Sequence, residues 1–267
     1  SLAVCGTIND LAVTGAKPLG LSLGLIIAEG FAKADLHVVL DAIAESSVAA
    51  SVPVITGDTK VVGAKQADGI YITTAGIGRV PNGRTLSPER VEPGDVLIVN
   101  GPIGEHGLAV MLTREMPDVQ SVLTTDAAPL NGLIDQLLET CGDDVVFIRD
   151  ATRSGVAGVA ADLASATGLH VTLDEAAIPI RPQAHHAAEM LGLDPLEIAN
   201  EGKLIAVVRA GAAAAALEVM QANPRGQDAA IVGRVDNEAD GLCDVYTTIG
   251  GRRILQKPYG EQLPRIC

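Results

Sequence analysis

Short runs of β-branched and aliphatic residues alternate with segments of helical periodicity along most of this chain. The strand-like "DVLIVN" is followed by a Gly-rich turn and the helix-like "GLAVML", and the same alternation recurs around "VVFIRD", "LHVTLDE" and "KLIAVVRA". Such a pattern predicts an α/β chain, of mixed α/β and α+β character, in which helices cover the faces of sheets.

A few elements can be predicted in more detail. Apolar residues recur every three or four positions between Lys33 and Ala50, which predicts an amphipathic helix. The run "VPVITGDTKVV" predicts a short strand, a Gly-Asp turn and a second apolar run, and Asn9 and Asp10 are expected at a strand end or turn.

The loop "PNGRTLSPERVEPGD" is dense in Pro and Gly, and we place a domain boundary in it. The expected units are residues 1–86, residues 87–250 and a tail over 251–267. Two prolines and a glycine after Leu255 oppose a helix or a central strand, so the tail, which ends on Cys267, is expected to be a mobile arm.

Composition narrows the class of protein. Hydrophobic residues make up 48% of the chain but aromatic residues only 2%, so the core must be aliphatic. The formal net charge of −14 argues against a nucleic-acid binder, which needs a basic surface to displace phosphate counterions.

No apolar run approaches the roughly 18–20 residues of a membrane span, and no leader is recognisable, so a cytoplasmic location is expected. The four cysteines lie far apart and form no CxxC pair, which predicts neither a disulfide framework nor a structural zinc site.

The familiar nucleotide motifs are absent: the chain has no GxxxxGK[ST] loop and no GxGxxG turn between a strand and a helix. Polar residues near strand ends remain as candidates. Asp10 and Asp58 are carboxylates of the kind that Mg²⁺ prefers, with Asn9 assisting, although each of the three could instead cap a turn or helix. Asp150 is a further candidate for metal or nucleotide.

The residues that open the helix after "RDATRSG" offer a second kind of site. Thr152, Ser154 and the free amides of a helix start could hold phosphate, although plain helix capping explains them about equally well. His106, in the Gly-flanked "GEHG", is a candidate near the substrate or an ordinary loop histidine.

Six segments together resemble the HypE family of hydrogenase maturation factors: "CGTINDLAVTGAKP", "ITGDTKVV", "GPIGEHGLAV", "DATRSGVAGVAADLA", "LDPLEIANEGKLIAVV" and the final "PRIC". The resemblance covers essentially the whole chain and starts inside the family's pattern, so the first unit is expected to lack an upstream segment. The wider superfamily includes aminoimidazole ribonucleotide synthetase, selenophosphate synthetase and thiamin-monophosphate kinase.

The resemblance implies two α/β domains, of which the first binds ATP with Mg²⁺ and pairs into a homodimer. It implies ATP-dependent dehydration of a carboxamide, carried on the thiol of Cys267, to a thiocyanate that supplies the cyanide ligands of [NiFe] hydrogenase. The implied partners are the carbamoyltransferase HypF and the iron-carrying HypC–HypD complex.

Residue roles follow from the same resemblance. Cys267 is the expected carrier, Glu201 the base that removes a proton from the carboxamide, and Lys60 the cation that polarises the oxygen. His106 completes the expected catalytic set, and the expected nucleotide contacts are Asn9, Asp10, Asp58, Thr59, Asp150 and Thr152. The alternatives are another ATP-dependent synthetase or small-molecule kinase of the superfamily, or a carrier that displays a thiol without performing chemistry.

Overall fold

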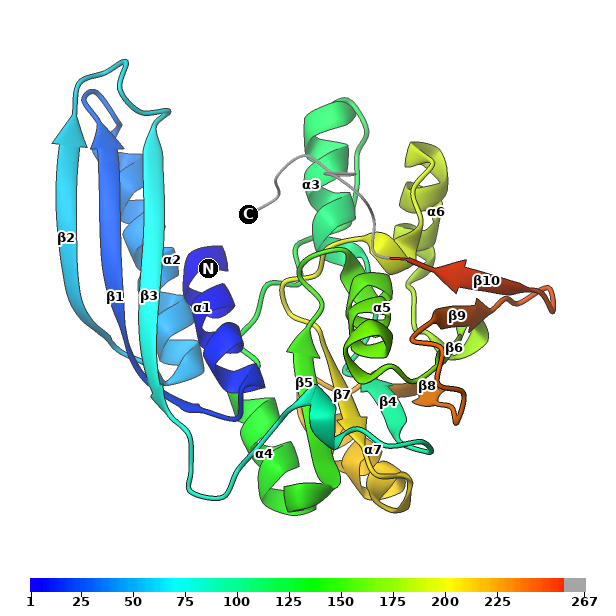
Figure 1. Cartoon of the computed structure of the whole chain (residues 1–267). Helices are drawn as coiled ribbons and strands as arrows, with labels where there is room; N and C mark the ends of the chain where they lie inside the picture. Colours follow the sequence, from blue (N-terminus) through cyan, green and yellow to red (C-terminus); the bar gives the residue numbers. More distant parts are fainter. Residues whose placement is uncertain (257–267) are drawn as a thin grey trace.

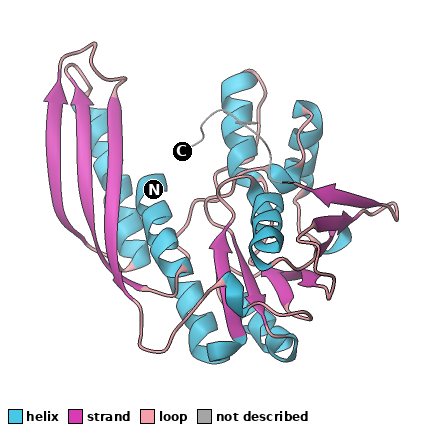
Figure 2. Cartoon of the chain, in the orientation of Figure 1, coloured by secondary structure: helices cyan, strands magenta, loops and turns pink. Residues whose placement is uncertain are grey.

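The computed structural model describes residues 1–256 of the 267-residue chain and contains two separate sheets (Figures 1 and 2). The smaller sheet has β1 (Lys17–Ala28) at its centre, parallel to β2 (Val54–Val62) and antiparallel to β3 (Ile70–Arg79). Helices α1 (Leu2–Val13) and α2 (Lys33–Ala50) share one hydrophobic cluster with this sheet, so they cover the same face. That cluster includes Val4, Ile8, Leu21, Ile43 and Val52.

The opposite face of the small sheet is uncovered in the single chain. Ile26 is paired with Lys60 on β2 and with Tyr71 on β3, so these three side chains lie on one face. Ile26, Tyr71 and Ile77, which lies further along the same face of β3, are exposed. We call this surface the outer face of the small sheet.

The larger sheet has seven strands in the order β10-β9-β6-β8-β4-β7-β5, and β6–β9 is the parallel pair among its described pairings. Its strands are β4 (Val96–Val99), β5 (Val145–Asp150), β6 (Val171–Asp174), β7 (Leu204–Val208), β8 (Ala230–Val235), β9 (Cys243–Tyr246) and β10 (Arg252–Leu255). The remaining helices are α3 (Glu105–Glu115), α4 (Asn131–Cys141), α5 (Gly155–Thr167), α6 (Pro182–Leu191) and α7 (Ala213–Ala222), with short 3-10 turns at Pro88–Arg90, Gly142–Asp144, Glu175–Ala177, Pro195–Glu197 and Ala210–Ala212.

Helices cover both faces of the larger sheet. Helix α5 packs with Leu97 and Val207 on one face, whereas α4 and α7 pack with Ile98 and Ala206 on the other. All five residues of β7 are therefore buried, which explains why "LIAVV" is a continuous aliphatic run rather than an alternating one. Helices α3 and α6 pack against each other in a separate cluster around Leu108 and Ala188.

Much of the predicted pattern is confirmed. The mixed fold class is observed, the helix from Lys33 to Ala50 has the predicted bounds, and α5 ends at Gly168 as expected. Two local predictions were wrong. Asn9 and Asp10 lie within helix α1, and "VITGDTKVV" forms one continuous strand without a turn.

The continuity of β2 has a packing reason. A Cβ atom at Gly57 would lie 2.9 Å from the carbonyl oxygen of Leu23 on β1, so the absence of a side chain allows the strands to pair closely. Gly-Asp is a common turn sequence, but here Gly57 allows β2 to lie close to β1 within the sheet.

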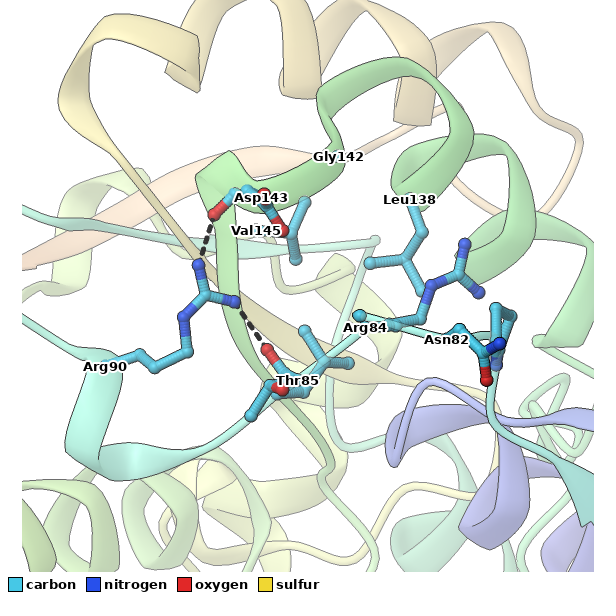
Figure 3. A pocket seen from close by; sticks show the side chains of 11 residues that line it. Asn82, Arg84, Thr85, Arg90, Leu138, Gly142, Asp143 and Val145 are labelled. Carbon is cyan, nitrogen blue, oxygen red and sulfur yellow. Dashed lines mark hydrogen bonds between the residues drawn. The ribbon is translucent and has the colours of Figure 1, made fainter.

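The connection between the two sheets is braced by arginines. Arg90 donates hydrogen bonds to the carbonyl oxygens of Thr85 and Asp143, across a pocket of about 310 Å³ that Arg84 also lines (Figure 3). These bonds fix residues 84–90 against the start of β5. The expected boundary near residue 86 falls in this braced segment and stays a prediction.

Within residues 1–256, none of the helices combines the length and the apolar character needed to cross a membrane.

Candidate active site

A cleft of about 750 Å³ is lined by residues of α1, the edge strand β3 and the end of β5. Figure 1 shows how these three elements are arranged. Helix α1 lies between the small sheet and β5. It therefore contributes both to the hydrophobic cluster of the small sheet and to this cleft. The cleft is lined by Leu2, Ala3, Gly6, Thr7, Asp10, Ile72, Thr73, Thr74, Arg149, Asp150, Thr152, Arg153 and Glu201.

Glu201 is the most strongly perturbed acid of the cleft. The residue is 5% exposed, and burial raises the pKa of its carboxyl to about 7, with further increases from the negative charges of Asp126, Asp150 and Asp10. A carboxyl with a pKa near neutrality can accept a proton and later release it, which is the property of a general base.

The backbone of Glu201 is held on both sides. Its N–H donates to Oδ1 of Asp126 at 2.9 Å, and its carbonyl oxygen accepts from Nδ2 of Asn9 at 3.3 Å. Next to it, Nδ2 of Asn100 donates to the carbonyl oxygen of Gly202 at 3.1 Å. The loop that carries Glu201 is therefore fixed by side chains from three other segments, as a preorganised catalytic group requires.

Gly202 allows this loop to pack closely. A Cβ atom at this position would lie 2.0 Å from the carbonyl oxygen of Asp126, which no side chain can tolerate. The "NEGK" segment therefore combines a buried acid with a glycine that brings the 126–128 segment against it.

Asp10 and Asp150 bring two further carboxylates to the cleft. Burial, followed by the charge of Asp150, raises the pKa of Asp10, while Arg153 lowers it. A bound cation would relieve this repulsion. Among residues 1–256 there is no group of three His, Cys, Asp or Glu side chains arranged to hold a metal, so Mg²⁺ here would need further oxygen ligands from phosphate or water, as Mg²⁺ commonly has.

The loop between β5 and α5 supplies polar groups to the same cleft. Thr152 Oγ1 donates to Oδ2 of Asp150 at 2.9 Å, and the guanidinium-bearing Arg149 and Arg153 flank them. Ser154, the N-cap of α5, has a left-handed backbone with φ 58°. This conformation is costly for a residue other than glycine, and such strain occurs most often at functional loops.

Comparisons with known proteins identify the family of this chain. Two family models match, "AIR synthase related protein, N-terminal domain" over residues 1–80 and its C-terminal domain over residues 92–243. The carbamoyl dehydratase HypE of Rhizobium leguminosarum bv. viciae is 45% identical over 267 residues, covering 100% of this chain and 76% of the relative.

Solved structures give the same result. A HypE structure in complex with ATP superposes with a TM-score of 0.93 at 36% identity, covering 100% of this chain and 80% of that one. HypE in a HypE–HypF complex gives a TM-score of 0.91 at 40% identity, covering 96% and 83% of the two chains. This chain belongs to the HypE family of carbamoyl dehydratases.

The structure brings only some of the residues expected from the HypE pattern into the cleft. Asp10, Asp150, Thr152 and Glu201 line it together. Asn9 lies beneath it, 1% exposed, where its side chain bonds Ala128, Leu130 and Glu201. Asn9 therefore holds the Glu201 loop, and its contact with nucleotide stays a prediction.

The "GDTK" residues of the HypE pattern lie elsewhere in the single chain. Asp58 and Lys60 are exposed on the outer face of the small sheet, with Thr59 between them on the opposite side of β2. Two strand spacings, about 10 Å, separate β2 from β3, and the cleft begins at β3. Within one chain, Lys60 and the cleft are thus separated by the width of the small sheet.

His106 is buried at the start of α3, and its Nδ1 lies 2.7 Å from Oγ1 of Thr125. Burial lowers the pKa of His106, so the neutral ring is favoured near pH 7. His106 does not line the cleft of Glu201. Cys267, the expected carrier in the HypE pattern, lies outside the described residues.

Sequence reasoning missed Asp126. Its segment, "TTDAAPL", has no regular secondary structure and no motif, so only the folded contact with Glu201 and Lys203 reveals it. Arg149 was missed too, because an arginine near a strand end carries no specific signal.

Proposed function

We propose that this chain is an ATP-dependent carbamoyl dehydratase that converts a carboxamide on the Cys267 thiol into a thiocyanate during hydrogenase maturation. The observation that carries the proposal is Glu201: a buried carboxyl with its pKa raised to about 7, fixed by its backbone at one end of a cleft that also holds Asp10, Asp150 and two arginines.

The reaction converts –S–C(=O)NH₂ into –S–C≡N, so one oxygen and two protons must leave the carboxamide. When bound, ATP supplies the phosphoryl group that turns the amide oxygen into a leaving group. Glu201, ionised at and above neutral pH, accepts one proton from the amide nitrogen, the second N–H proton is released to water, and the oxygen leaves as inorganic phosphate. Because burial, and then the charges of Asp126, Asp150 and Asp10, destabilise its ionised form, Glu201 is a stronger base than an ordinary glutamate.

The cleft also fits the nucleotide. Arg153 provides positive charge for phosphate, together with Arg149, which also pairs with Asp162 at 3.1 Å. Asp10 and Asp150 provide carboxylate oxygens for Mg²⁺. The loop before α5 presents backbone amides at the start of a 13-residue helix, which favours anions. These groups would hold ATP and Mg²⁺ beside Glu201.

We further propose that the functional unit is a homodimer formed through the outer face of the small sheet. Exposed Ile26, Tyr71 and Ile77 offer an apolar surface that a second copy would cover. Asp58 and Lys60 lie on the same face, so each copy would present them to its partner. Lys60 would then polarise the oxygen in the partner's cleft, since the cleft of its own chain begins two strands away, at β3.

Cys267 would carry the substrate between sites. A thiol that follows a Pro-containing sequence suits a group that must visit a nucleotide cleft and then meet other proteins. We propose a HypF-type carbamoyltransferase as the source of the carboxamide, supported by the known HypE–HypF complex, and a HypC–HypD-type complex as the acceptor, with the reaction taking place in the cytoplasm.

Intact-mass analysis tests this function. The full-length protein would be carbamoylated and then treated with ATP, and the adduct should lose one water only when ATP is present. Cys267→Ser should carry no adduct, whereas a superfamily kinase would keep its turnover without this thiol. An adduct that loses water without ATP, or one that Glu201→Gln dehydrates at the full rate, would contradict the proposal.

A further inference from the structure

Asp126 is a buried acid outside the cleft. Its side chain is 3% exposed, and it lies in the irregular connection between α3 and α4. Neither the cleft lining nor the expected catalytic set includes it. A buried carboxylate is costly unless its charge is paired and its oxygens accept hydrogen bonds, so this one requires an explanation.

Both oxygens of Asp126 are occupied by the Glu201 loop. Oδ1 accepts a hydrogen bond from the backbone N–H of Glu201 at 2.9 Å, and Oδ2 accepts one from Nζ of Lys203 at 2.8 Å. Lys203 is itself buried, with its side chain 10% exposed. One carboxylate therefore bridges the residues on both sides of Gly202.

The segment that carries Asp126 is fixed as well. Thr125 Oγ1 lies 2.7 Å from Nδ1 of buried His106 and accepts the N–H of Ala127 at 3.1 Å. Asn9 binds the carbonyl oxygen of Ala128 at 3.0 Å. Asp126 is consequently held from α3 on one side and from α1 on the other.

The geometry points to Asp126, paired with Lys203, as the positioning residue of Glu201 in the dehydration reaction. Asp126 fixes the backbone at the base, while Lys203 forms a 2.8 Å ion pair with its other oxygen and balances its charge. The negative charge of Asp126 also acts on the Glu201 side chain together with Asp150 and Asp10. His106 then has a role in supporting the Asp126 segment, without touching substrate.

This inference rests on the proposed function, and a double-mutant cycle separates the two. Single-turnover loss of water from the carbamoylated full-length protein would be measured for Asp126→Ala, Glu201→Gln and the double variant. If Asp126 acts through Glu201, Asp126→Ala lowers the rate about tenfold or more in the native background and has little further effect once Glu201 is replaced. Equal losses in both backgrounds would overturn the positioning role.

The proposed function fails in a different way, because Glu201→Gln alone would then retain the native rate. Asp118→Ala is the matched control, since Asp118 lies on the same connection but is exposed, and the rate of this variant should be unchanged.

A second measurement is used if a variant dehydrates the adduct too slowly for the double-mutant cycle, or if Asp126→Ala does not fold. Asp126→Asn keeps an oxygen for the Glu201 N–H but removes the charge, and adding Lys203→Met avoids leaving an unpaired buried lysine. In the single variant, the acid limb of the pH–rate profile should move to lower pH, because Glu201 loses a neighbouring negative charge. The double variant also loses the positive charge of Lys203, so its shift should be smaller. An acid limb at the native pH would overturn the inference.

Discussion

Nδ2 of Asn9 donates a hydrogen bond to the carbonyl oxygen of Glu201 at 3.3 Å, although the two residues are 192 positions apart. The same amide nitrogen donates to Ala128, and Oδ1 accepts the N–H of Leu130 at 2.8 Å. A helix that packs against the small sheet thereby holds the loop that carries the proposed base.

Replacing Asn9 with Ala should destabilise the fold. The substitution leaves the buried Leu130 N–H and two carbonyl oxygens without their hydrogen bonds to Asn9. An unsatisfied buried polar group lowers the free energy of unfolding by about 1–3 kcal/mol. Urea unfolding would measure the loss. Asn82→Ala removes the same side chain from an exposed position and should change the free energy of unfolding little. Equal stability of the two variants would show that the Asn9 bonds contribute nothing.

Glu201 should make stability depend on pH. Its pKa is raised from 4.5 to about 7 on folding, so ionisation destabilises the native state increasingly as pH rises from about 4.5 to about 7. Glu201→Gln should therefore be more stable than the native protein above pH 7, by at most about 3 kcal/mol, and the difference should vanish below about pH 4.

Chemical unfolding of the ATP-free protein across this pH range checks the prediction. Glu218→Gln, an exposed substitution on α7, should show no such pH dependence relative to the native protein. A stability difference for Glu201→Gln that stays constant with pH would mean that the carboxyl has an ordinary pKa.

Lys60 should act across the proposed dimer. Lys60→Ala and Glu201→Gln should each lose most dehydration activity, because each removes one half of the catalytic pair from every site. After unfolding and refolding together, about half of the dimers carry both variants, and each of these has one intact site, so about a quarter of the native activity should return. A mixture as inactive as its components would place Lys60 outside the partner's site.

An element of the fold can be predicted from the sequence when its pattern is local, and not when it depends on contacts with residues far away in the chain. The α2 helix and the aliphatic strands of the larger sheet are predictable because their periodicity is local and their burial is strong. Helix α1 is not, because Gly6, Thr7 and the Asn9–Asp10 pair have low helix propensity and only its packing against Leu21 and Ile43 makes it helical. Tertiary packing overrides local preference there.

The residues of the candidate site also fall into two groups, those that a sequence motif predicts and those that only the folded contacts reveal. Glu201 and Asp10 stand in segments whose resemblance to a known family is clear, and the fold brings both to one cleft. The face on which Lys60 lies depends on the pairing register of β2 with β1, which the local sequence does not specify. Asp126 acts through a contact 75 residues away in the chain, and no local pattern encodes it.

The central claim is that ATP removes the oxygen of a carboxamide held on Cys267. Labelling that amide oxygen with oxygen-18 before adding ATP, followed by mass analysis of the phosphate and of the Cys267 adduct, tests it most directly. The account predicts that the label appears in inorganic phosphate as the adduct loses one water. Label that appears in solvent water while the phosphate stays unlabelled would contradict it.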